Sequence, residues 1–380
     1  MLNDLLIEMQ LSDIIIQKIR KEGPVSFHDF MEIALYYPEK GYYTTSQDKI
    51  GVAGDFYTSS SLTPAFGAMI GRQLEEMWDV LGKNEFSIVE YGAGTGTLCH
   101  DILDYLKKNK KFYDHLNYCI IEKSAAMREK EKLHLHDKVY WYETIKDIPE
   151  ITGCILSNEL IDNFSVHQVV MEDELMEVFI GYDNGFVELL KPASNVLKDY
   201  LAELKVVLPK GFRTEINLEA TEWIKEIAES LQMGYVLTID YGYPSASLYS
   251  ESRRSGTLLS YNKHKIIDNI YLNIGEQDIT SHVNFSALKH WGLKSGLLCC
   301  GITKLTDFLL ALGFKDYLRN ALTLETGQDL LSLVRKESFL THTLLVDMGT
   351  KFKVLIQGKG IENTDLTGLK VFNIAMTGAL

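Results

Sequence analysis

The sequence lacks an apolar run of the length that a membrane span needs. In 380 residues, no apolar stretch approaches the ~18 residues of a transmembrane helix, so we expect no membrane span. The first 23 residues are acidic early and amphipathic. They lack the basic region and cleavage site of a signal peptide, and they lack the Arg-rich, acid-poor character of a transit peptide. The start therefore predicts a first helix and a cytoplasmic protein.

An excess of positive charge is also missing. The formal net charge is −14, whereas nucleic-acid-binding proteins usually carry a basic face, so we expect no nucleic-acid partner. An acidic chain is compatible with a basic substrate, such as an arginine-bearing protein segment. Cysteine is scarce and shows neither C-x-x-C nor metal-ligand spacing, which predicts buried reduced thiols and no metal site. The five cysteines are Cys99, Cys119, Cys154, Cys299 and Cys300.

The most informative stretch is the glycine-rich segment 90–96, EYGAGTG. It follows an apolar run, residues 86–89, that is typical of a buried parallel strand. It precedes residues 97–108, in which apolar side chains recur on one helical face. Strand, glycine turn and helix form the first half of a βαβ unit. Glycine lets the backbone turn tightly and approach a ligand, and the helix N-terminus offers free N–H groups.

The spacing of the glycines indicates the class of ligand. The dinucleotide fingerprint G-x-G-x-x-G would need glycine where Thr97 stands. Instead Gly92, Gly94 and Gly96 alternate, and Glu90 precedes them. A leading carboxylate suits a ligand that carries a sulfonium and an ammonium, and it would repel a pyrophosphate. This form resembles the first motif of class I S-adenosyl-L-methionine (SAM) methyltransferases. The alternative is a tight turn that binds no ligand.

Strands alternate with helices along the chain, which predicts a doubly wound parallel sheet. Ligands in such sheets lie beyond the carboxyl ends of the strands. Acidic and amide side chains follow several expected strands there: Glu90, Glu122, Asn158, Glu159 and Asp240. Glu122 is expected to accept hydrogen bonds from a ribose, and the alternative is a solvated strand end.

Three further residues are candidates for chemistry. Glu159 and Asp162 could bind a cationic acceptor beside Asn158, but this segment could equally cap a helix. His282 follows Asp278 in a polar loop. A lone histidine is usually structural, although a carboxylate could orient it for acid–base work.

Two antiparallel features are also expected. Apolar residues alternate between residues 167 and 191 around an Asp-Asn-Gly turn, which predicts an antiparallel insertion. A last hairpin is predicted over residues 341–348 and 351–356. A long loop of small and polar residues, 50–61, is expected to be functional.

Together these stretches resemble the MidA-type methyltransferases, which comprise a mitochondrial complex I assembly methyltransferase and its bacterial relatives. The resemblance runs from about residue 15 to 345. The matching stretches are IGVAGDFYTSSSLTPAFG (50–67), IVEYGAGTGTLCHDIL (88–103), IIEKSAAMRE (120–129), LSNELIDNFSVHQVV (156–170), LTIDYGYP (237–244), GEQDITSHVNFSAL (275–288) and TDFLLALG (306–313).

The resemblance implies a SAM-dependent methyltransferase that forms S-adenosyl-L-homocysteine (SAH) and methylates arginine in a complex I core subunit. The alternatives are a methyltransferase that acts on another protein or a small molecule, and an assembly chaperone that binds SAM without turnover. A eukaryotic homologue would be mitochondrial. The residues implied to bind the cofactor are Gly54, Asp55, Phe56, Glu90, Gly92, Gly94, Gly96, Glu122 and Asn158. Glu159 is our candidate to bind the guanidinium. Asp162, Asp240 or His282 could take the proton, and we rank His282 slightly ahead.

The predicted fold is α/β, with a class I Rossmann-like methyltransferase sheet, an N-terminal helical segment and an antiparallel insertion. The predicted segments are 1–83, helical with a lid; 84–345, the core with insertions at about 165–215 and 244–290; and 346–380, a strand and tail.

Overall fold

The computed structural model describes residues 9–45, 59–135, 138–262, 265–267, 269–323, 329–362 and 364–370. The chain divides into two compact units, and each is described by itself. The parallel-sheet unit comprises Tyr57–Glu159, Lys225–Tyr241 and Gly292–Leu380. The antiparallel-sheet unit comprises Met1–Phe56, Leu160–Ile224 and Gly242–Trp291.

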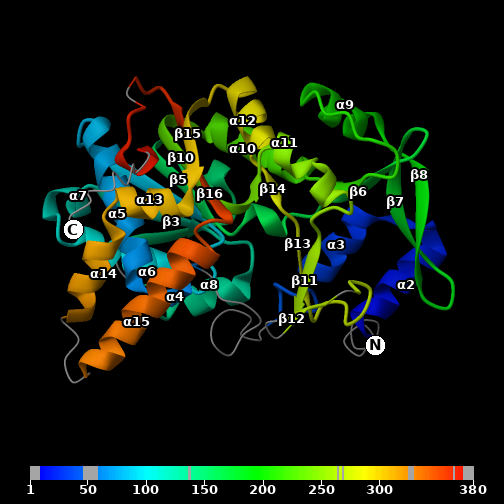
Figure 1. Cartoon of the computed structure of the whole chain (residues 1–380), viewed down its shortest axis with the longest axis horizontal. Helices are drawn as coiled ribbons and strands as arrows, with labels where there is room; N and C mark the ends of the chain where they lie inside the picture. The colour runs from blue at the N-terminus through cyan, green and yellow to red at the C-terminus, as the bar shows by residue number, and fades with distance from the viewer. Residues whose placement is uncertain are drawn as a thin grey trace, which may run out of the picture. The chain divides into compact units, whose positions relative to one another are not determined.

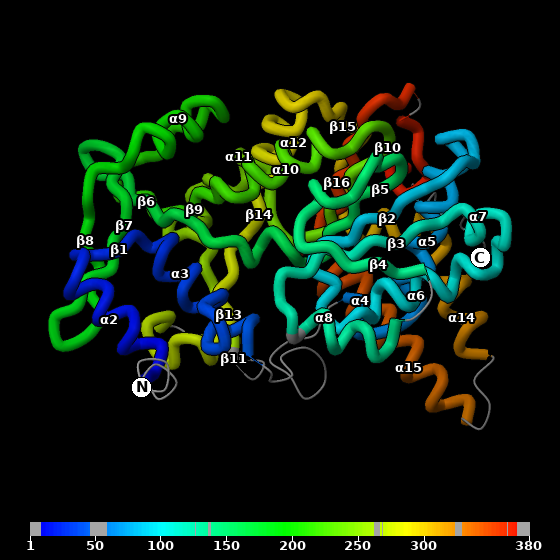
Figure 2. Tube along the Cα trace, turned by 180° about the vertical axis from the view of Figure 1, so that it is seen from behind, coloured from blue at the N-terminus to red at the C-terminus, as the bar shows by residue number. Residues whose placement is uncertain are grey.

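One mixed sheet organises the parallel-sheet unit, in the order β15-β16-β10-β5-β2-β3-β4. Figure 2 shows β5, β2, β3 and β4 running side by side. Strand β16 is antiparallel to both neighbours, and β10, β5, β2, β3 and β4 are mutually parallel. The bounds are β2 (Phe86–Tyr91), β3 (Leu116–Ile121), β4 (Val139–Tyr142), β5 (Ile151–Asn158), β10 (Leu231–Tyr243), β15 (Leu298–Lys304) and β16 (Phe352–Lys359).

Helices α5 and α6 pack beside each other and share one hydrophobic core with the sheet (Figure 1). Helix α5 begins at Pro64, where proline is tolerated, and the Thr63 hydroxyl accepts a hydrogen bond from the Ala65 N–H. The other helices of this unit complete its core. The bounds are α4 (Ser59–Leu62), α5 (Pro64–Val80), α6 (Thr97–Leu106), α7 (Lys110–Asp114), α8 (Ala125–Lys132), α13 (Leu305–Ala311), α14 (Phe314–Thr323) and α15 (Leu330–His342), with α10 (Leu218–Ser230) shared between the units.

The antiparallel-sheet unit contains the predicted insertion. Strands β7 and β8 form a long hairpin (Figure 1), which turns at the expected Asp-Asn-Gly segment, where Asn184 has φ +52°. Strands β6, β9 and β1 extend the same sheet. The bounds are α2 (Leu11–Glu22), β1 (Val25–Ser26), α3 (Phe27–Tyr36), β6 (His167–Met171), β7 (Leu175–Tyr182), β8 (Phe186–Pro192), α9 (Asn195–Glu203), β9 (Arg213–Ile216), α11 (Ser245–Leu248), β11 (Leu259–Asn262), β12 (Lys265–Ile266), β13 (Asp278–Thr280), β14 (Val283–Asn284) and α12 (Phe285–Lys294).

The predicted C-terminal hairpin is half wrong. Residues 352–356 lie in strand β16 as predicted, but Thr343–Asp347 forms a π-helical turn that follows α15. Leu340 and Leu344 are both buried and stand four residues apart, so helical burial overrides the alternation that suggested a strand. No helix in the described part of the chain is long and apolar enough to cross a membrane.

Candidate cofactor site

The glycine loop connects β2 to α6 with three left-handed residues. Gly92, Gly94 and Gly96 have φ of +62°, +60° and +77°. This conformation is costly for any residue with a Cβ, so the alternating glycines are explained by backbone geometry. Helix α6 starts at Thr97 without a side-chain cap. Its first N–H groups are therefore available to a ligand, as the site hypothesis requires.

Gly96 has a second reason to be glycine. A Cβ on Gly96 would stand 2.9 Å from Cδ1 of Leu135 and 3.8 Å from Cγ of Glu131. Its need for glycine is therefore explained by packing beneath the loop. Gly92 is exposed and Gly94 is half-buried. At these two positions, which lie on the accessible side of the loop, the left-handed backbone explains the glycines.

Glu90 is directed into the core. It is 3% exposed, and its Oε2 accepts a hydrogen bond of 2.7 Å from the Tyr118 hydroxyl of the neighbouring strand. Burial raises the pKa of Glu90 to about 7, although the Tyr118 hydrogen bond opposes this. If Glu90 assists a cation on the loop, as the sequence suggested, it does so from beneath the loop.

Glu122 stands immediately after β3 and is half-buried. Its Oε1 accepts a hydrogen bond of 2.7 Å from the Ser124 N–H. Burial raises the pKa of Glu122, whereas the Ser124 N–H and the positive charge of Arg128 lower it. Glu122 is predicted to bind the ribose. Its place at the end of β3 fits this prediction, because β3 pairs with β2, the strand that leads into the glycine loop.

Asn158 and Glu159 lie together at the end of β5, as predicted. Oε1 of Glu159 accepts hydrogen bonds from the Ser59 N–H (2.9 Å), the Ser59 hydroxyl (3.0 Å) and the Asn158 amide (3.3 Å). Glu159 has φ +52°, a conformation that non-glycine residues adopt mostly where surrounding contacts enforce it. Burial raises the pKa of Glu159, and the Ser59 hydrogen bonds oppose that rise. The carboxylate therefore already binds the first residue of α4. The helical turn that follows this segment, Ile161–Asn163, has no side-chain cap, so the predicted helix cap is not observed.

Asp162 and His282 lie in the antiparallel-sheet unit. The Ser281 N–H donates to the Asp162 carbonyl (3.0 Å), and the His282 N–H donates to the Thr257 hydroxyl (3.0 Å). The structure thus brings the backbone of Asp162 beside the segment that carries His282. Asp162 is 3% exposed. The predicted cofactor residues Gly54, Asp55 and Phe56 lie outside the described residues.

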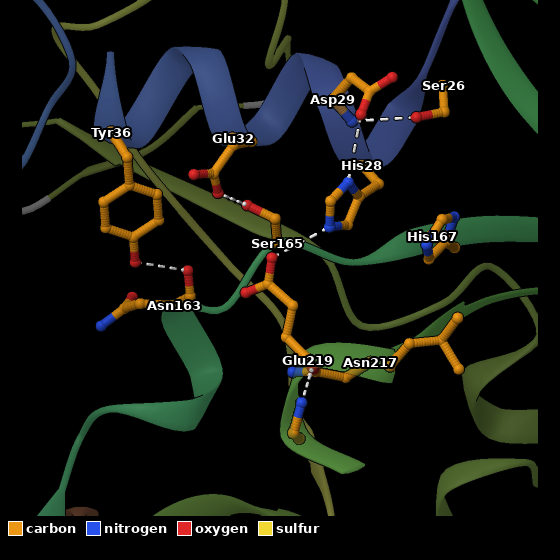
Figure 3. Close-up of polar contacts among 12 residues, drawn as sticks. Ser26, His28, Asp29, Glu32, Tyr36, Asn163, Ser165, His167, Asn217 and Glu219 are labelled. Atoms are coloured by element: carbon orange, nitrogen blue, oxygen red, sulfur yellow. Dashed lines mark hydrogen bonds and ion pairs between the residues drawn. The ribbon is translucent and has the colours of Figure 1, made fainter. Parts of the chain in front are cut away.

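A second polar group in the antiparallel-sheet unit was not predicted. Figure 3 shows His28 between two carboxylates: its Nδ1 lies 3.4 Å from Oδ1 of Asp29, and its Nε2 lies 3.0 Å from Oε1 of Glu219. The His28 ring stacks on His167 at 4.7 Å. We call His28, Asp29, His167 and Glu219 the His28 cluster. Hydrogen bonds to both carboxylates raise the pKa of His28 to about 9.

No motif could have revealed the His28 cluster, because His28 and Glu219 stand 191 residues apart in the chain. Two further contacts join α3 to the segment before β6 (Figure 3). The Ser165 hydroxyl donates to Oε2 of Glu32 (2.8 Å), and the Tyr36 hydroxyl donates to the Asn163 carbonyl (2.8 Å). Among the described residues, no group of three His, Cys, Asp or Glu side chains is placed to hold a metal ion.

Comparison with known proteins relates these features to a family. Residues 69–303 match the family model described as "Putative S-adenosyl-L-methionine-dependent methyltransferase". The chain is 28% identical to the Caenorhabditis elegans "Protein arginine methyltransferase NDUFAF7 homolog, mitochondrial", over 90% of this chain and 85% of that protein. It is 27% identical to the Homo sapiens "Protein arginine methyltransferase NDUFAF7, mitochondrial", over 72% of this chain and 66% of that protein.

A crystal structure supports the same relationship. A Burkholderia thailandensis protein bound to S-adenosyl-homocysteine superposes with a TM-score of 0.83 at 28% identity, covering 94% of each chain. The predicted class I methyltransferase fold is confirmed by this match. The left-handed glycines, the uncapped start of α6 and the carboxylate after β3 fit a SAM cofactor, which supplies an electrophilic methyl group on a sulfonium.

Proposed function

Because this chain belongs to the S-adenosyl-L-methionine-dependent methyltransferase family, it is an enzyme that uses SAM, and we propose that its acceptor is an arginine side chain of a protein. The observation that carries the proposal is the similarity to named protein arginine methyltransferases over 90% of the chain. The net charge of −14 is compatible with a cationic acceptor.

The chemistry assigns distinct roles to the residues of the chain. The N–H groups at the start of α6 and the backbone of Gly92 and Gly94 hold the cofactor, with Glu122 on its ribose. The acceptor guanidinium stays protonated with a pKa above ~12, so its reacting nitrogen must regain a lone pair. A carboxylate that binds the other two nitrogens fixes their direction and keeps charge away from the reacting atom.

Glu159 is the carboxylate that we propose for this role. Its hydrogen bonds to Ser59 and Asn158 hold it in one orientation, which suits a residue that positions another group. Asn158 lies at the same strand end, where the proposal places the cofactor. Asp162 and His282 remain the proposed proton acceptors, and the loop containing Gly54, Asp55 and Phe56 remains a proposed cofactor cover.

We propose a core subunit of respiratory complex I as the acceptor protein, which the MidA-type resemblance implies. The chain would then act where that complex is assembled, in the cytoplasm of a bacterium or in the mitochondrion of a eukaryote. Fractionation of source cells, followed by detection of the chain, tests the compartment independently of activity.

The function is tested by methyl transfer from radiolabelled SAM to purified complex I subunits. Acid hydrolysis should release label as methylarginine. Gly94→Val is the negative control, because a β-branched side chain at φ +60° is strained and stands on the cofactor side of the loop. Gly185→Ala is the matched control at an open position, where an added Cβ meets nothing within 4 Å. Label on another amino acid, or on a small molecule, would overturn the arginine proposal.

A further inference from the structure

Two buried carboxyl groups lie beneath the glycine loop, and neither forms an ion pair within the described residues. Glu90 lies on β2 with its side chain directed into the core, and it is 3% exposed. Glu131 lies on α8 and is fully buried. A buried carboxylate without a cation is costly, so chains usually avoid one unless it has a use. Glu131 was not among the residues that the sequence indicated.

Glu131 contacts the loop through its stem and the sheet through its carboxyl group. Its Cγ lies 3.8 Å from the position of a Cβ on Gly96, at van der Waals contact, beside the Leu135 Cδ1 that would block that Cβ at 2.9 Å. Its Oε2 accepts a hydrogen bond of 2.7 Å from the Trp141 Nε1–H of β4. Its Oε1 is buried and has no hydrogen-bond partner among the described residues. Within the described part of the chain, only one of the two oxygens of this carboxyl group has a hydrogen-bond partner, and the group packs under the glycine loop. We take this as an indication of a role beyond packing.

Charged and titratable groups face Glu131 from each neighbouring element. They are Glu90 on β2, Cys99 on α6, Glu122 after β3, Arg128 on α8 and, as a neutral donor, Trp141 on β4. Two of these elements are joined to the loop: β2 leads into it and α6 leads away from it. Since acids outnumber the single arginine, the space behind the loop becomes strongly negative whenever Glu131 is ionised.

We propose that Glu131 is an electrostatic positioning residue of the cofactor site, whose negative charge makes the glycine loop prefer the cationic methyl donor to the neutral product. SAM carries a sulfonium, and SAH has a thioether in its place. A charge behind the loop therefore stabilises the donor more than the product, even though both ligands share the ribose and adenine. The inference rests on the proposed cofactor role of the glycine loop, and it adds a determinant that favours release of the product.

The preference should depend on pH near neutrality. Burial raises the pKa of Glu131 to about 8, the charges of Glu122 and Glu90 raise it further, and the Trp141 hydrogen bond opposes them. Below that pH Glu131 is neutral and contributes little discrimination. As the pH rises through about 8 it ionises, and the preference for SAM increases.

Calorimetric affinities for SAM and SAH between pH 6 and 9 test the inference. The measured quantity is the ratio of the SAH to the SAM dissociation constant in the parent, divided by the same ratio in Glu131→Gln. Glutamine keeps the shape and stays neutral, and the ligands' own titration is common to both proteins. We expect this quotient to rise roughly threefold or more across the range. The matched control is Glu129→Gln, which removes an exposed charge from the same helix.

A quotient that stays flat while both ligands bind the parent overturns the inference and leaves the proposed function intact. A parent that binds neither ligand overturns the cofactor assignment itself, and the inference with it. Glu129→Gln should follow the parent, and a response equal to that of Glu131→Gln would show that surface charge alone is responsible, which also overturns the inference.

A second variant covers the case in which Glu131→Gln does not fold. Trp141→Phe keeps an aromatic ring but removes the donor to Oε2 of Glu131. Because that hydrogen bond favours the ionised carboxylate, its loss should move the midpoint of the pH-dependent preference upward. A midpoint identical to that of the parent would overturn the inference.

Discussion

Four carboxylates of the parallel-sheet unit and one carboxylate of the antiparallel-sheet unit are in opposite electrostatic situations. In the parallel-sheet unit, Glu90 and Glu131 are buried, Glu122 and Glu159 are half-buried, and desolvation raises the pKa of each. In the antiparallel-sheet unit, Asp29 lies against the imidazole of His28, and that contact lowers the pKa of Asp29. The difference shows that a carboxyl group's environment, more than its residue type, decides whether it holds a structure together or stays available to a ligand.

The largest effect is expected at Glu159, where the contrast between the carboxylates of the two units can be tested most directly. Glu159→Gln should lower the rate of methyl transfer roughly a hundredfold and leave SAM affinity unchanged. The reason is that the NH₂ group of the amide would face the N–H donors of the guanidinium, so that two donors would meet. Steady-state kinetics and calorimetry measure the two quantities. Glu150→Gln, at an exposed position of the same unit, is the control. Unchanged turnover with a lowered melting temperature would show that Glu159 serves only as the cap of Ser59.

The next effect is expected at Glu122. Glu122→Ala should weaken SAM and SAH alike by ~1.5–3 kcal/mol, since both ligands carry the ribose hydroxyls that a charged group would accept. Titration calorimetry with each ligand measures this. The control is Glu143→Ala, which removes an acid that is 75% exposed and pairs with Arg128. An unchanged dissociation constant would mean that Glu122 is a strand-end residue that only accepts from Ser124.

A smaller effect is expected from His28, on stability. Its pKa is raised from 6.5 to about 9 in the folded protein, so its stabilisation is complete below pH 6.5 and is lost as the pH rises through 9. His28→Gln should therefore lower the free energy of unfolding by about 1–2 kcal/mol at pH 6, after allowance for solvent screening, and by little above pH 9. Urea denaturation at both pH values measures this difference.

The control for that experiment is His342→Gln, because His342 pairs with Asp347 at 3.2 Å while 65% exposed. An exposed pair should contribute ~0–1 kcal/mol. If both histidine variants lower the free energy of unfolding equally, the carboxylates around His28 do not stabilise the antiparallel-sheet unit.

The smallest effect is expected at Ser165. Ser165→Ala removes a hydrogen bond from a fully buried hydroxyl to the exposed carboxylate of Glu32, which should cost about 1 kcal/mol. Urea denaturation of Ser165→Ala beside the exposed-site control Ser252→Ala measures it. An unchanged free energy of unfolding for Ser165→Ala would show that the Ser165–Glu32 hydrogen bond does not stabilise the unit.

Local patterns in the sequence predicted much of what was found. The apolar run before Glu90, the alternating glycines and the helical face after them specify a strand, a turn and a helix within about twenty residues, because each depends on neighbours close in the chain. Short-range turn chemistry likewise placed the hairpin between β7 and β8. The π-helical turn at Thr343–Asp347 was missed, since burial of Leu340 and Leu344 by distant elements overrides local alternation.

By itself, the sequence determined the family, the sheet and the glycine loop from which we inferred the cofactor. These features follow from the order and spacing of residues along the chain. Only the tertiary structure decided which carboxyl groups are buried and what each one contacts. Glu131 meets Gly96 and Trp141, Glu159 meets Ser59, and His28 meets Glu219 across 191 residues. Burial and charge depend on distances through space, and no spacing along a chain encodes them.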